Sequence, residues 1–387
     1  MALTVAHSFL LIRLIHTPID EADFALPVFK TEEIALTWEF GRDKRALIDF
    51  IRGSAIFLML WGHSIQYSSG GQIDFFEDVA FKAIYSFHMP LFMLISGYLF
   101  HSSAMKRDLF ELVEHKVKTI LYPILMCSLL NLLLTNGVVV FLRRGAGATS
   151  LLGAVPLTSL WFLWSVLSCS VAMALVVKLT DSPVLRVALA IAGFGFVALF
   201  PCWEMNVWMW PYFVVGYVFA ASEARFVRMV TIIGVTCTLA FLAMLVFYRS
   251  CHYIYSTGLI GGASLRESFA IDVFRWAIGL FGAMSTVCVG IMMTQRLSDT
   301  NVVRKVLEAL GHNSLAIYAL SVSLLSFWWP RVASRLLELF SMVDFCDCLW
   351  VYDCILTPIV AVVYSLLLLW IVRLFGCLGL CRLVFGR

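Results

Sequence analysis

Long apolar runs separated by short polar connections make up most of the chain, and this pattern predicts membrane-spanning helices. The hydrocarbon core of a bilayer is about 30 Å thick, so a spanning helix needs about 20 mostly apolar residues. Ten runs approach that length, although glycine or proline interrupts several of them. They cover residues 53–69, 83–100, 119–142, 160–178, 184–200, 207–222, 229–248, 272–293, 312–330 and 355–375. The pattern predicts an all-α integral membrane protein, a bundle of about ten transmembrane helices.

The composition agrees with this prediction and excludes other classes. Hydrophobic residues make up 61% and charged residues 14% of the chain, and the mean hydropathy is +0.91. A soluble globule with a polar surface does not have these values. No repeat of about 20–50 residues divides the sequence, so we expect residues 45–387 to form one transmembrane domain. The net charge of +3 comes without a basic cluster interleaved with aromatic residues, so we expect no nucleic-acid partner.

The distribution of Lys and Arg over the connections predicts the orientation in the membrane. Cytoplasmic connections are enriched in these two residues. If the N-terminus is cytoplasmic, the inside segments hold seventeen of them and the outside segments eight. We therefore expect both ends of the chain and the connection at 106–118 to be cytoplasmic.

Residues 1–44 fit poorly with the rest of the chain. The apolar run at 8–12 is short, has no basic region before it and is followed by Arg13 and His16, so we expect no cleaved signal peptide. Acidic and polar residues come next. The segment is either a cytoplasmic arm that lies on the membrane or an over-extended translation start, and the sequence leaves both alternatives open.

The eleven cysteines do not form a metal-binding pattern. Cys346, Cys348 and Cys354 share a predicted outside connection, where one disulfide could form and a third thiol would remain. Cys377 and Cys381 have no His or Cys partner at metal-ligand spacing. We therefore expect no metal site.

Two ionisable residues, Arg52 and His63, lie within the first apolar run. Eleven helical steps turn the chain by about 1100°, close to three full turns, and advance it by about 16 Å, so both side chains share one face at different depths. Ionisable residues inside a span are costly and indicate a functional site. The simpler alternative is an arginine that reaches the interface and a histidine hydrogen-bonded between helices. Asp49, three residues before Arg52, can pair with it.

The second apolar run carries His88, Pro90 and the small pair Ser96 and Gly97. His63 and His88 are expected at similar depths, because one span rises from the inner boundary and the next descends from the outer one. Two antiparallel neighbours would then bring both histidines to one cavity. The alternative for His88 is a lone histidine with its hydrogen bonds satisfied.

A polar segment with Lys116, Lys118 and Tyr122 leads into the third span. Basic residues at the start of a helix are suited to hold the phosphates of a nucleotide-like donor. The alternative is ordinary anchoring of a helix at the cytoplasmic side.

Together these segments resemble the acyltransferase-3 family of bacterial membrane acyltransferases, most closely its fucose 4-O-acetylase-like and nodulation-factor acetylase-like branch. The resemblance spans about residues 45–375 and rests on five features: Arg-x3-Asp-x2-Arg-Gly at 45–53, the spacing of Arg52 and His63, His-Met-Pro-Leu-Phe…Ser-Gly-Tyr at 88–98, Trp-Phe-Leu at 161–163, and Gly-x-Asn-Ser-Leu-x-Ile-Tyr at 311–318. Two departures stand out. Lys116 and Lys118 replace arginines of the family, and Ser321 replaces a frequent histidine, which leaves the role of the late segment open.

The resemblance implies an enzyme of the bacterial inner membrane that transfers an acyl group, usually acetyl. The implied donor is cytoplasmic acyl-CoA, usually acetyl-CoA. The implied acceptor is a sugar hydroxyl of a cell-envelope or exported glycan, or of its lipid-linked precursor, and membrane lipids surround the protein.

The resemblance also implies roles for the candidate residues. His63 would be the general base, because imidazole titrates near neutral pH, with a transient acyl-histidine as an alternative. Arg52, paired to Asp49, would hold the CoA phosphates or orient the site. The further donor-binding residues would be Lys116, Lys118 and Tyr122. The acceptor-side or supporting residues would be His88 and Ser96.

Two other classes of function remain open at this stage. A proton-coupled transporter or flippase of a glycan precursor would also place histidine and arginine inside the membrane. A scaffold of a glycan-export complex is the third class, and it predicts that His63 is dispensable.

Overall fold

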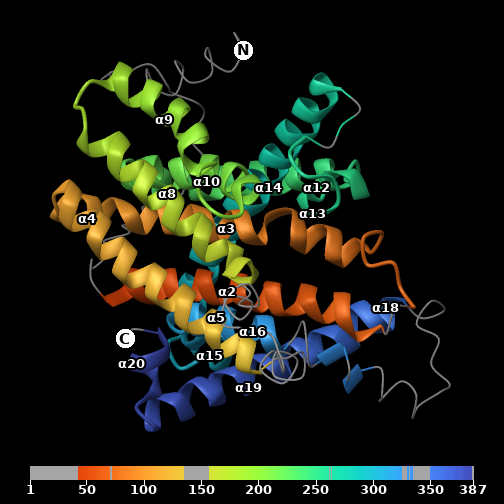
Figure 1. Ribbon diagram of the computed structural model, residues 1–387. Coiled ribbons are helices and arrows are strands. Elements are labelled where there is room, and N and C mark those ends of the chain that lie inside the picture. Colours follow the sequence, from red (N-terminus) through yellow and green to blue (C-terminus); the bar gives the residue numbers. More distant parts are fainter. Residues whose placement is uncertain are drawn as a thin grey trace, which may run out of the picture. The chain divides into compact units, whose positions relative to one another are not determined.

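The computed structural model (Figure 1) describes residues 42–69, 72–134, 157–260, 262, 264–324, 329–330, 332–333 and 349–385. The chain divides into two compact units, Met1–Asp43 and Lys44–Arg387. Nearly all of the described residues belong to the second unit. The expected N-terminal arm lies almost entirely outside the described residues, and so do Cys346 and Cys348 of the expected disulfide. Cys354 is exposed and carries a free thiol.

Helices are the only regular elements among the described residues, which confirms the all-α prediction. A helix satisfies its backbone hydrogen bonds within one segment, as a bilayer interior without water requires. The elements are α2 (Arg42–Ser68), α3 (Val79–Lys106), α4 (Leu109–Lys116), η1 (Val117–Leu121), α5 (Tyr122–Leu134), η2 (Leu157–Leu160), α8 (Trp161–Lys178), α9 (Pro183–Val197), α10 (Trp203–Ala221), α11 (Glu223–Arg228), α12 (Val230–Leu245), η3 (Ser250–His252), α13 (Ile254–Thr257), α14 (Leu265–Arg296), α15 (Val302–His312), α16 (Ser314–Ser323), α18 (Leu349–Val351), η5 (Tyr352–Leu356), α19 (Thr357–Cys377) and α20 (Leu380–Phe385).

Among the described residues, five helical stretches are long and apolar enough to cross a membrane. They are Lys44–Ser68, Val79–Lys106, Trp161–Lys178, Leu265–Arg296 and Leu349–Cys377. The shorter apolar helices α9 and α12 coincide with two more of the predicted spans. The other predicted spans overlap α5, α10 and α16, so each of the ten apolar runs contains a helix.

Some helices begin or end at residues other than the bounds of the predicted apolar runs, because polar residues extend the helix or interrupt it. Helix α2 begins at Arg42, well before the apolar run, because the polar lead-in residues continue the same helix. The ninth run begins at a break. Helix α15 ends at His312, and α16 starts at Ser314 after Asn313, whose side-chain amide donates to the carbonyl of Ala309 at 2.9 Å.

Helix α3 passes through the middle of the bundle (Figure 1) and packs against α10 and α14. Glycines permit the close contact with α10. A Cβ atom built on Gly97 would lie 2.0 Å from the carbonyl oxygen of Phe213, and one built on Gly216 would lie 2.0 Å from that of Leu94. The two backbones therefore touch, which fixes the face that α3 presents to its neighbours.

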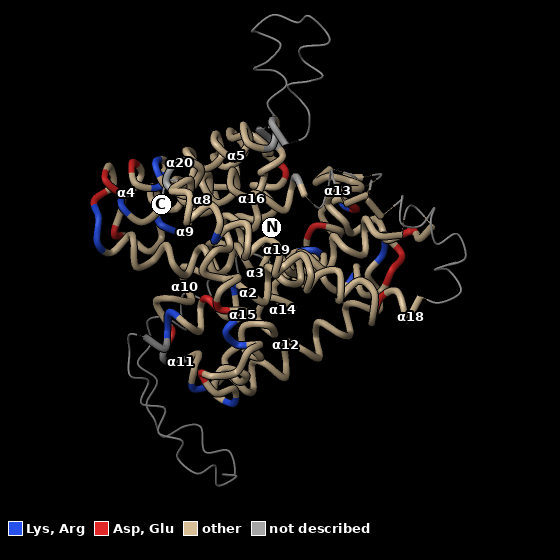
Figure 2. Tube along the Cα trace, turned by 90° about the horizontal axis from the view of Figure 1, so that it is seen from below, with Lys and Arg blue, Asp and Glu red and all other residues tan. Residues whose placement is uncertain are grey.

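Charged residues are concentrated away from the apolar helices. Figure 2 shows Lys and Arg positions along the trace of α4 and near α11 and α15, and a mostly uncharged trace through the helices between them. Acidic and basic residues also gather near α18 and α13. Most charged groups thus lie outside the apolar interior.

Candidate active site

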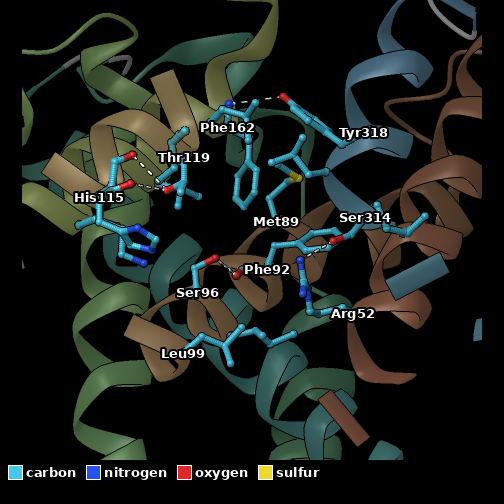
Figure 3. A pocket seen from close by; sticks show the side chains of 18 residues that line it. Arg52, Met89, Phe92, Ser96, Leu99, His115, Thr119, Phe162, Ser314 and Tyr318 are labelled. Carbon is cyan, nitrogen blue, oxygen red and sulfur yellow. Dashed lines mark hydrogen bonds between the residues drawn. The ribbon is translucent and has the colours of Figure 1, made fainter. Parts of the chain in front are cut away.

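A cavity of about 450 Å³ lies between α2, α3, the α4–η1 segment, α8 and α16. Its polar side chains are Arg52, Ser96, His115, Lys116, Thr119, Ser170, Ser314 and Tyr318. Its apolar wall includes Ile56, Met89, Phe92, Phe162 and Leu163. In Figure 3, Arg52 and His115 approach the cavity from opposite sides, and Met89 and Phe162 lie between them. Basic side chains therefore lie on two sides of the cavity, and apolar side chains line the space between them.

Lys116 and His115 lie on the side of the cavity opposite Arg52. Burial lowers the pKa of the Lys116 ammonium to about 8, and the Arg107 guanidinium acts in the same direction. Burial, together with the charges of Arg107 and Lys116, also lowers the pKa of His115. Lys116 Nζ lies 5.4 Å from the centre of the Phe100 ring, a cation–π contact. An anion in the cavity would relieve this accumulation of positive charge.

Arg52 is held by residues from two separate motifs. Its guanidinium lies 3.7 Å from Asp49 Oδ1 and donates to Ser314 Oγ at 2.5 Å. The other carboxylate oxygen of Asp49 lies 3.7 Å from His312 Nδ1. The expected pairing of Asp49 with Arg52 is therefore present, and Ser314 on α16 adds a contact that the sequence did not predict.

Two glycines bring α2 and α15 close enough for this contact. A Cβ atom built on Gly53 would lie 1.8 Å from the carbonyl oxygen of Leu307, and one built on Gly311 would lie 1.8 Å from that of Asp49. Any larger residue at either position would push the helices apart. The late segment at 311–318 thus packs against the first motif and contributes a hydrogen bond to Arg52.

His63 lies seven residues, or about 10 Å, further along α2 than Ile56 of the cavity wall. Its Nδ1 atom is 2.9 Å from the hydroxyl oxygen of Tyr85 and 3.2 Å from Gln66 Oε1. The ring of Tyr67 stacks on the imidazole at 5.7 Å, and that of Tyr85 meets it edge-on at 5.9 Å. His63 is only half-buried. It does not line the cavity described above.

The sequence predicted that His88 and His63 share one cavity, but neither histidine lines the cavity described above. The side chain of His88 is 2% exposed, and Nδ1 donates to the carbonyl of Ile84 at 2.9 Å. Its ring lies 4.8 Å from that of Tyr85, which also contacts His63. The two histidines are thus brought to one neighbourhood through a common tyrosine.

The expected group of donor-binding residues is only partly assembled. Arg52 and Lys116 line the cavity, whereas Lys118 and Tyr122 do not. The side chain of Lys118 is 72% exposed and pairs with Glu114, and Tyr122 is 38% exposed. Successive helical residues are about 100° apart, so a residue two positions after Lys116 points to nearly the opposite side.

One face of α3 connects the cavity with the surroundings of His63. Tyr85, Met89, Phe92 and Ser96 follow one another at helical spacing on this face. Met89, Phe92 and Ser96 line the cavity, and Tyr85 contacts His63 one turn further along. The Ser96 hydroxyl donates to the carbonyl of Phe92 at 2.8 Å. Tyr85 was not a candidate in the sequence, although this spacing could have identified it.

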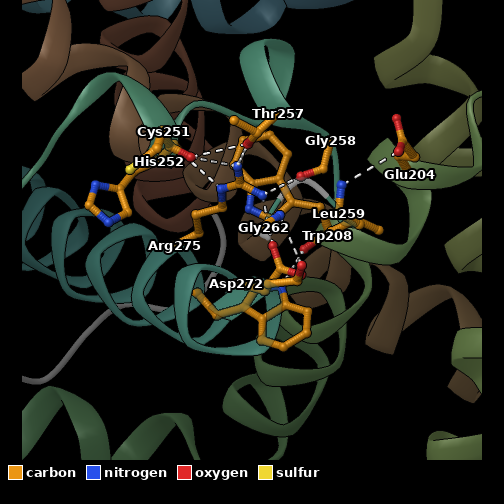
Figure 4. A network of polar contacts seen from close by, with 12 residues as sticks. Glu204, Trp208, Cys251, His252, Thr257, Gly258, Leu259, Gly262, Asp272 and Arg275 are labelled. Atoms are coloured by element: carbon orange, nitrogen blue, oxygen red, sulfur yellow. Dashed lines mark hydrogen bonds and ion pairs between the residues drawn. The ribbon is translucent and has the colours of Figure 1, made fainter. Parts of the chain in front are cut away.

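A buried arginine, Arg275, organises the connection between α12 and α14 (Figure 4). Arg275 is 2% exposed and pairs with Asp272 at 2.7 Å. It also donates to the carbonyls of Cys251, His252 and Gly258 and to the hydroxyl of Thr257. The connection that it holds carries Tyr255, whose ring lies 6.4 Å from that of Tyr85. The sequence had indicated only an outside charge at this position.

Within the described ranges, no group of three or more His, Cys, Asp or Glu side chains is arranged to hold a metal ion. The candidate site thus consists of a cavity lined by basic and apolar side chains and of His63, which contacts Tyr85 on the same face of α3 as the cavity wall.

A family model described as an acyltransferase domain, that of the acyltransferase-3 family, matches residues 45–377. The chain therefore belongs to this family and is a membrane-bound acyltransferase, as the sequence motifs had indicated.

Two curated proteins resemble the chain, and both are nodulation proteins. Nodulation protein NolL of Mesorhizobium japonicum is 27% identical over 298 residues, which cover 72% of this chain and 76% of that protein. Nodulation protein NolL of Sinorhizobium fredii is 32% identical over 183 residues, which cover 45% of this chain and 48% of that protein. These relatives agree with the predicted similarity to the nodulation-factor branch. No solved structure matches the chain.

The contact between Ser314 and Arg52 leads to a prediction about catalysis. A hydrogen bond to a charged group contributes about 1.5–3 kcal/mol, and about 1.4 kcal/mol corresponds to a factor of ten. Ser314→Ala should therefore lower the rate of acyl transfer by about tenfold or more, while Ser314→Thr, which keeps the hydroxyl, should retain most of it. Transfer by the purified proteins at equal concentration is the measurement.

Ser321→Ala is the matched control, because Ser321 is buried in the same helix and its hydroxyl donates only to the carbonyl of Tyr318 among the described residues, at 2.8 Å. Equal activities of Ser314→Ala and Ser321→Ala would contradict the assigned role of Ser314.

Proposed function

We propose that this enzyme transfers an acyl group, usually acetyl, from acyl-CoA to a sugar hydroxyl of a cell-envelope or exported glycan, with His63 as the general base. The observation that carries the proposal is the lining of the cavity, where Arg52 and Lys116 stand with apolar side chains such as Phe92, a combination that suits a donor with a charged head and a less polar arm. The resemblance to the nodulation-factor acetylase-like branch supports a glycan acceptor.

The donor head would bind between α2 and α4. Arg52 offers a planar fork of donors that matches phosphate oxygens, and Lys116 adds a compact positive charge. Arg52 and His63 are separated by eleven helical residues, or about 16 Å. The arm of the donor would cover this distance along Met89, Phe92 and Phe162, so that the thioester reaches the imidazole.

The reaction would balance as a direct acyl transfer. His63 accepts the proton of the sugar hydroxyl as the oxygen attacks the thioester carbonyl carbon. The carbon–sulfur bond then breaks, the acyl group stays on the sugar oxygen, and the CoA sulfur leaves with the proton returned by the imidazolium. A sugar hydroxyl is a weak nucleophile at neutral pH, so removal of its proton is the step that a base assists.

Other candidate residues would have supporting roles. Asp49 would fix the orientation of the Arg52 guanidinium through their ion pair. Ser96, on the cavity wall, would contact the donor arm. His88 would support the ring of Tyr85 through packing, because its Nδ1 proton is engaged by Ile84. Lys118 and Tyr122 are assigned no part in donor binding.

The proposed location is the bacterial inner membrane with both termini cytoplasmic, so that Arg52 and Lys116 face the cytoplasmic pool of acyl-CoA. The bias of Lys and Arg toward the inside connections supports this orientation.

Replacement of the base tests the proposed chemistry directly. General-base assistance is worth about 10²–10⁴ in rate. Purified His63→Asn should therefore lose at least about 99% of acetyl transfer from acetyl-CoA to an oligosaccharide acceptor, while its melting temperature and its binding of CoA stay close to those of the wild type. Transfer at the wild-type rate would contradict the function assigned to His63, and a wild type that never transfers from acyl-CoA would contradict the proposed donor.

The two lysines make a matched pair for the donor site. Lys116→Ala should weaken CoA binding about tenfold, as expected for the loss of a charged hydrogen bond, whereas Lys118→Ala should leave binding unchanged. Because the pKa of Lys116 is about 8, its ammonium is charged below that pH and neutral above it. Wild-type binding should weaken between about pH 7 and 9, and Lys116→Ala should lose this part of the pH dependence.

Isothermal titration calorimetry with CoA at several pH values measures both effects. A wild-type pH profile in Lys116→Ala would show that the lysine does not contact the donor.

Cysteine labelling tests the orientation. In a background without the eleven native cysteines, a cysteine at exposed position 106 should resist a membrane-impermeant thiol reagent in intact cells. A cysteine at exposed position 266 should react. Efficient labelling at position 106 in intact cells would contradict the proposed topology.

A further inference from the structure

We infer that Gln66 and Tyr85 are positioning residues that fix the tautomer of His63, so that Nε2 is the basic nitrogen and faces the reacting hydroxyl. This inference rests on the proposed role of His63 as general base. It assigns a function to two residues outside the family motifs and specifies which nitrogen carries the chemistry.

The partners of Nδ1 determine where the proton of the neutral imidazole lies. An amide oxygen only accepts hydrogen bonds, so the contact of Nδ1 with Gln66 Oε1 at 3.2 Å requires the proton on Nδ1. The Tyr85 hydroxyl oxygen lies 2.9 Å from the same nitrogen and shares this proton, while its own O–H points to Gln66 Oε1 at 3.4 Å. A neutral imidazole protonated at Nδ1 has its lone pair at Nε2.

The surroundings of Tyr85 explain why this tyrosine can reach His63. Its ring is buried and stacks on Phe81, with 3.9 Å between the ring centres. Gly62, adjacent to His63 in α2, leaves the necessary space, because a Cβ atom there would lie 2.5 Å from Cε2 of Tyr85. The stacked ring of Tyr67 restrains the imidazole from another side. The orientation of His63 therefore depends on contacts from both α2 and α3.

Neutral partners suit a histidine within a membrane span. A carboxylate in this position would also orient the ring, but an ionised carboxylate is costly inside a bilayer. An amide and a phenol orient the imidazole without adding a charge. Both bind the imidazole at Nδ1, which leaves Nε2 as the nitrogen for the reacting hydroxyl.

Substitutions that change one property at a time test the inference. Tyr85→Phe removes only the hydroxyl, and Gln66→Leu removes only the amide. Each should lower kcat by about 10- to 100-fold, with the KM for acetyl-CoA within about twofold of the wild type, because neither residue lines the donor cavity. Gln66→Glu keeps an acceptor oxygen and adds a charge that favours the protonated imidazole. It should move the acidic limb of the kcat/KM profile up by about one pH unit.

Tyr212→Phe is the matched control, because the Tyr212 hydroxyl is also buried and donates to the carbonyl of Arg275 at 3.1 Å, away from His63. It should leave the pH profile unchanged. An acidic limb at the wild-type pH in Gln66→Glu, or an unchanged kcat in Tyr85→Phe, would overturn the inference.

The His63→Asn variant separates this inference from the proposed function. If His63→Asn were active, the proposed function itself would fail. If His63→Asn were inactive while the Gln66 and Tyr85 variants behaved as the wild type, only the inference would fail.

A measurement on the unmodified sequence avoids any loss of folding in the variants. Nitrogen-15 NMR of histidine-labelled protein, with His63→Asn used to assign the signal, distinguishes the two neutral tautomers. The expected result is a proton on Nδ1 of His63. A proton on Nε2 would overturn the inference whatever the kinetics show.

Discussion

An unpaired guanidinium within an apolar span costs at least about 2.5 kcal/mol, and the packing around Arg52 meets this constraint. Asp49 supplies a carboxylate from the same helix, and Ser314 supplies a hydroxyl from another. The second contact requires α2 and α15 to touch, which Gly53 and Gly311 allow. The first and late motifs, far apart in the sequence, are therefore two sides of one contact. That contact fixes α16 beside α2 and, with it, one wall of the cavity.

The cavity and the surroundings of His63 differ in charge. Three basic side chains, those of Arg52, His115 and Lys116, line the cavity. The partners of His63 are neutral, a phenol and an amide. A ligand with an anionic head and a reactive group at the far end of a less polar arm matches this division. The proposed assignment of acyl-CoA as donor follows from the match, and the family membership of the chain establishes the acyltransferase activity that the donor would serve.

Features set by helical periodicity could be predicted from the sequence. The apolar runs gave the helices, and the spacing of Arg52 and His63 gave their common face, because the period of a helix is fixed. Contacts between helices depend on packing and were missed. Tyr85 reaches His63 only because Gly62 leaves room, and Ser314 reaches Arg52 only because two glycines bring the helices together. The sequence alone could not distinguish whether His88 shares a site with His63 or donates its hydrogen bond to the backbone, as it does to Ile84. Lys116 and Lys118 were treated as equivalent although a separation of two residues sends them to opposite sides.

One donor molecule is proposed to reach from Arg52 and Lys116 in the cavity to His63. An electron cryomicroscopy structure of the protein with bound CoA would show whether it does. We expect phosphate groups against Arg52 and Lys116, the arm along Met89 and Phe162, and the thiol directed toward Nε2 of His63. CoA bound with its phosphates away from Arg52, or with its thiol on the side of the bundle remote from His63, would contradict this proposal.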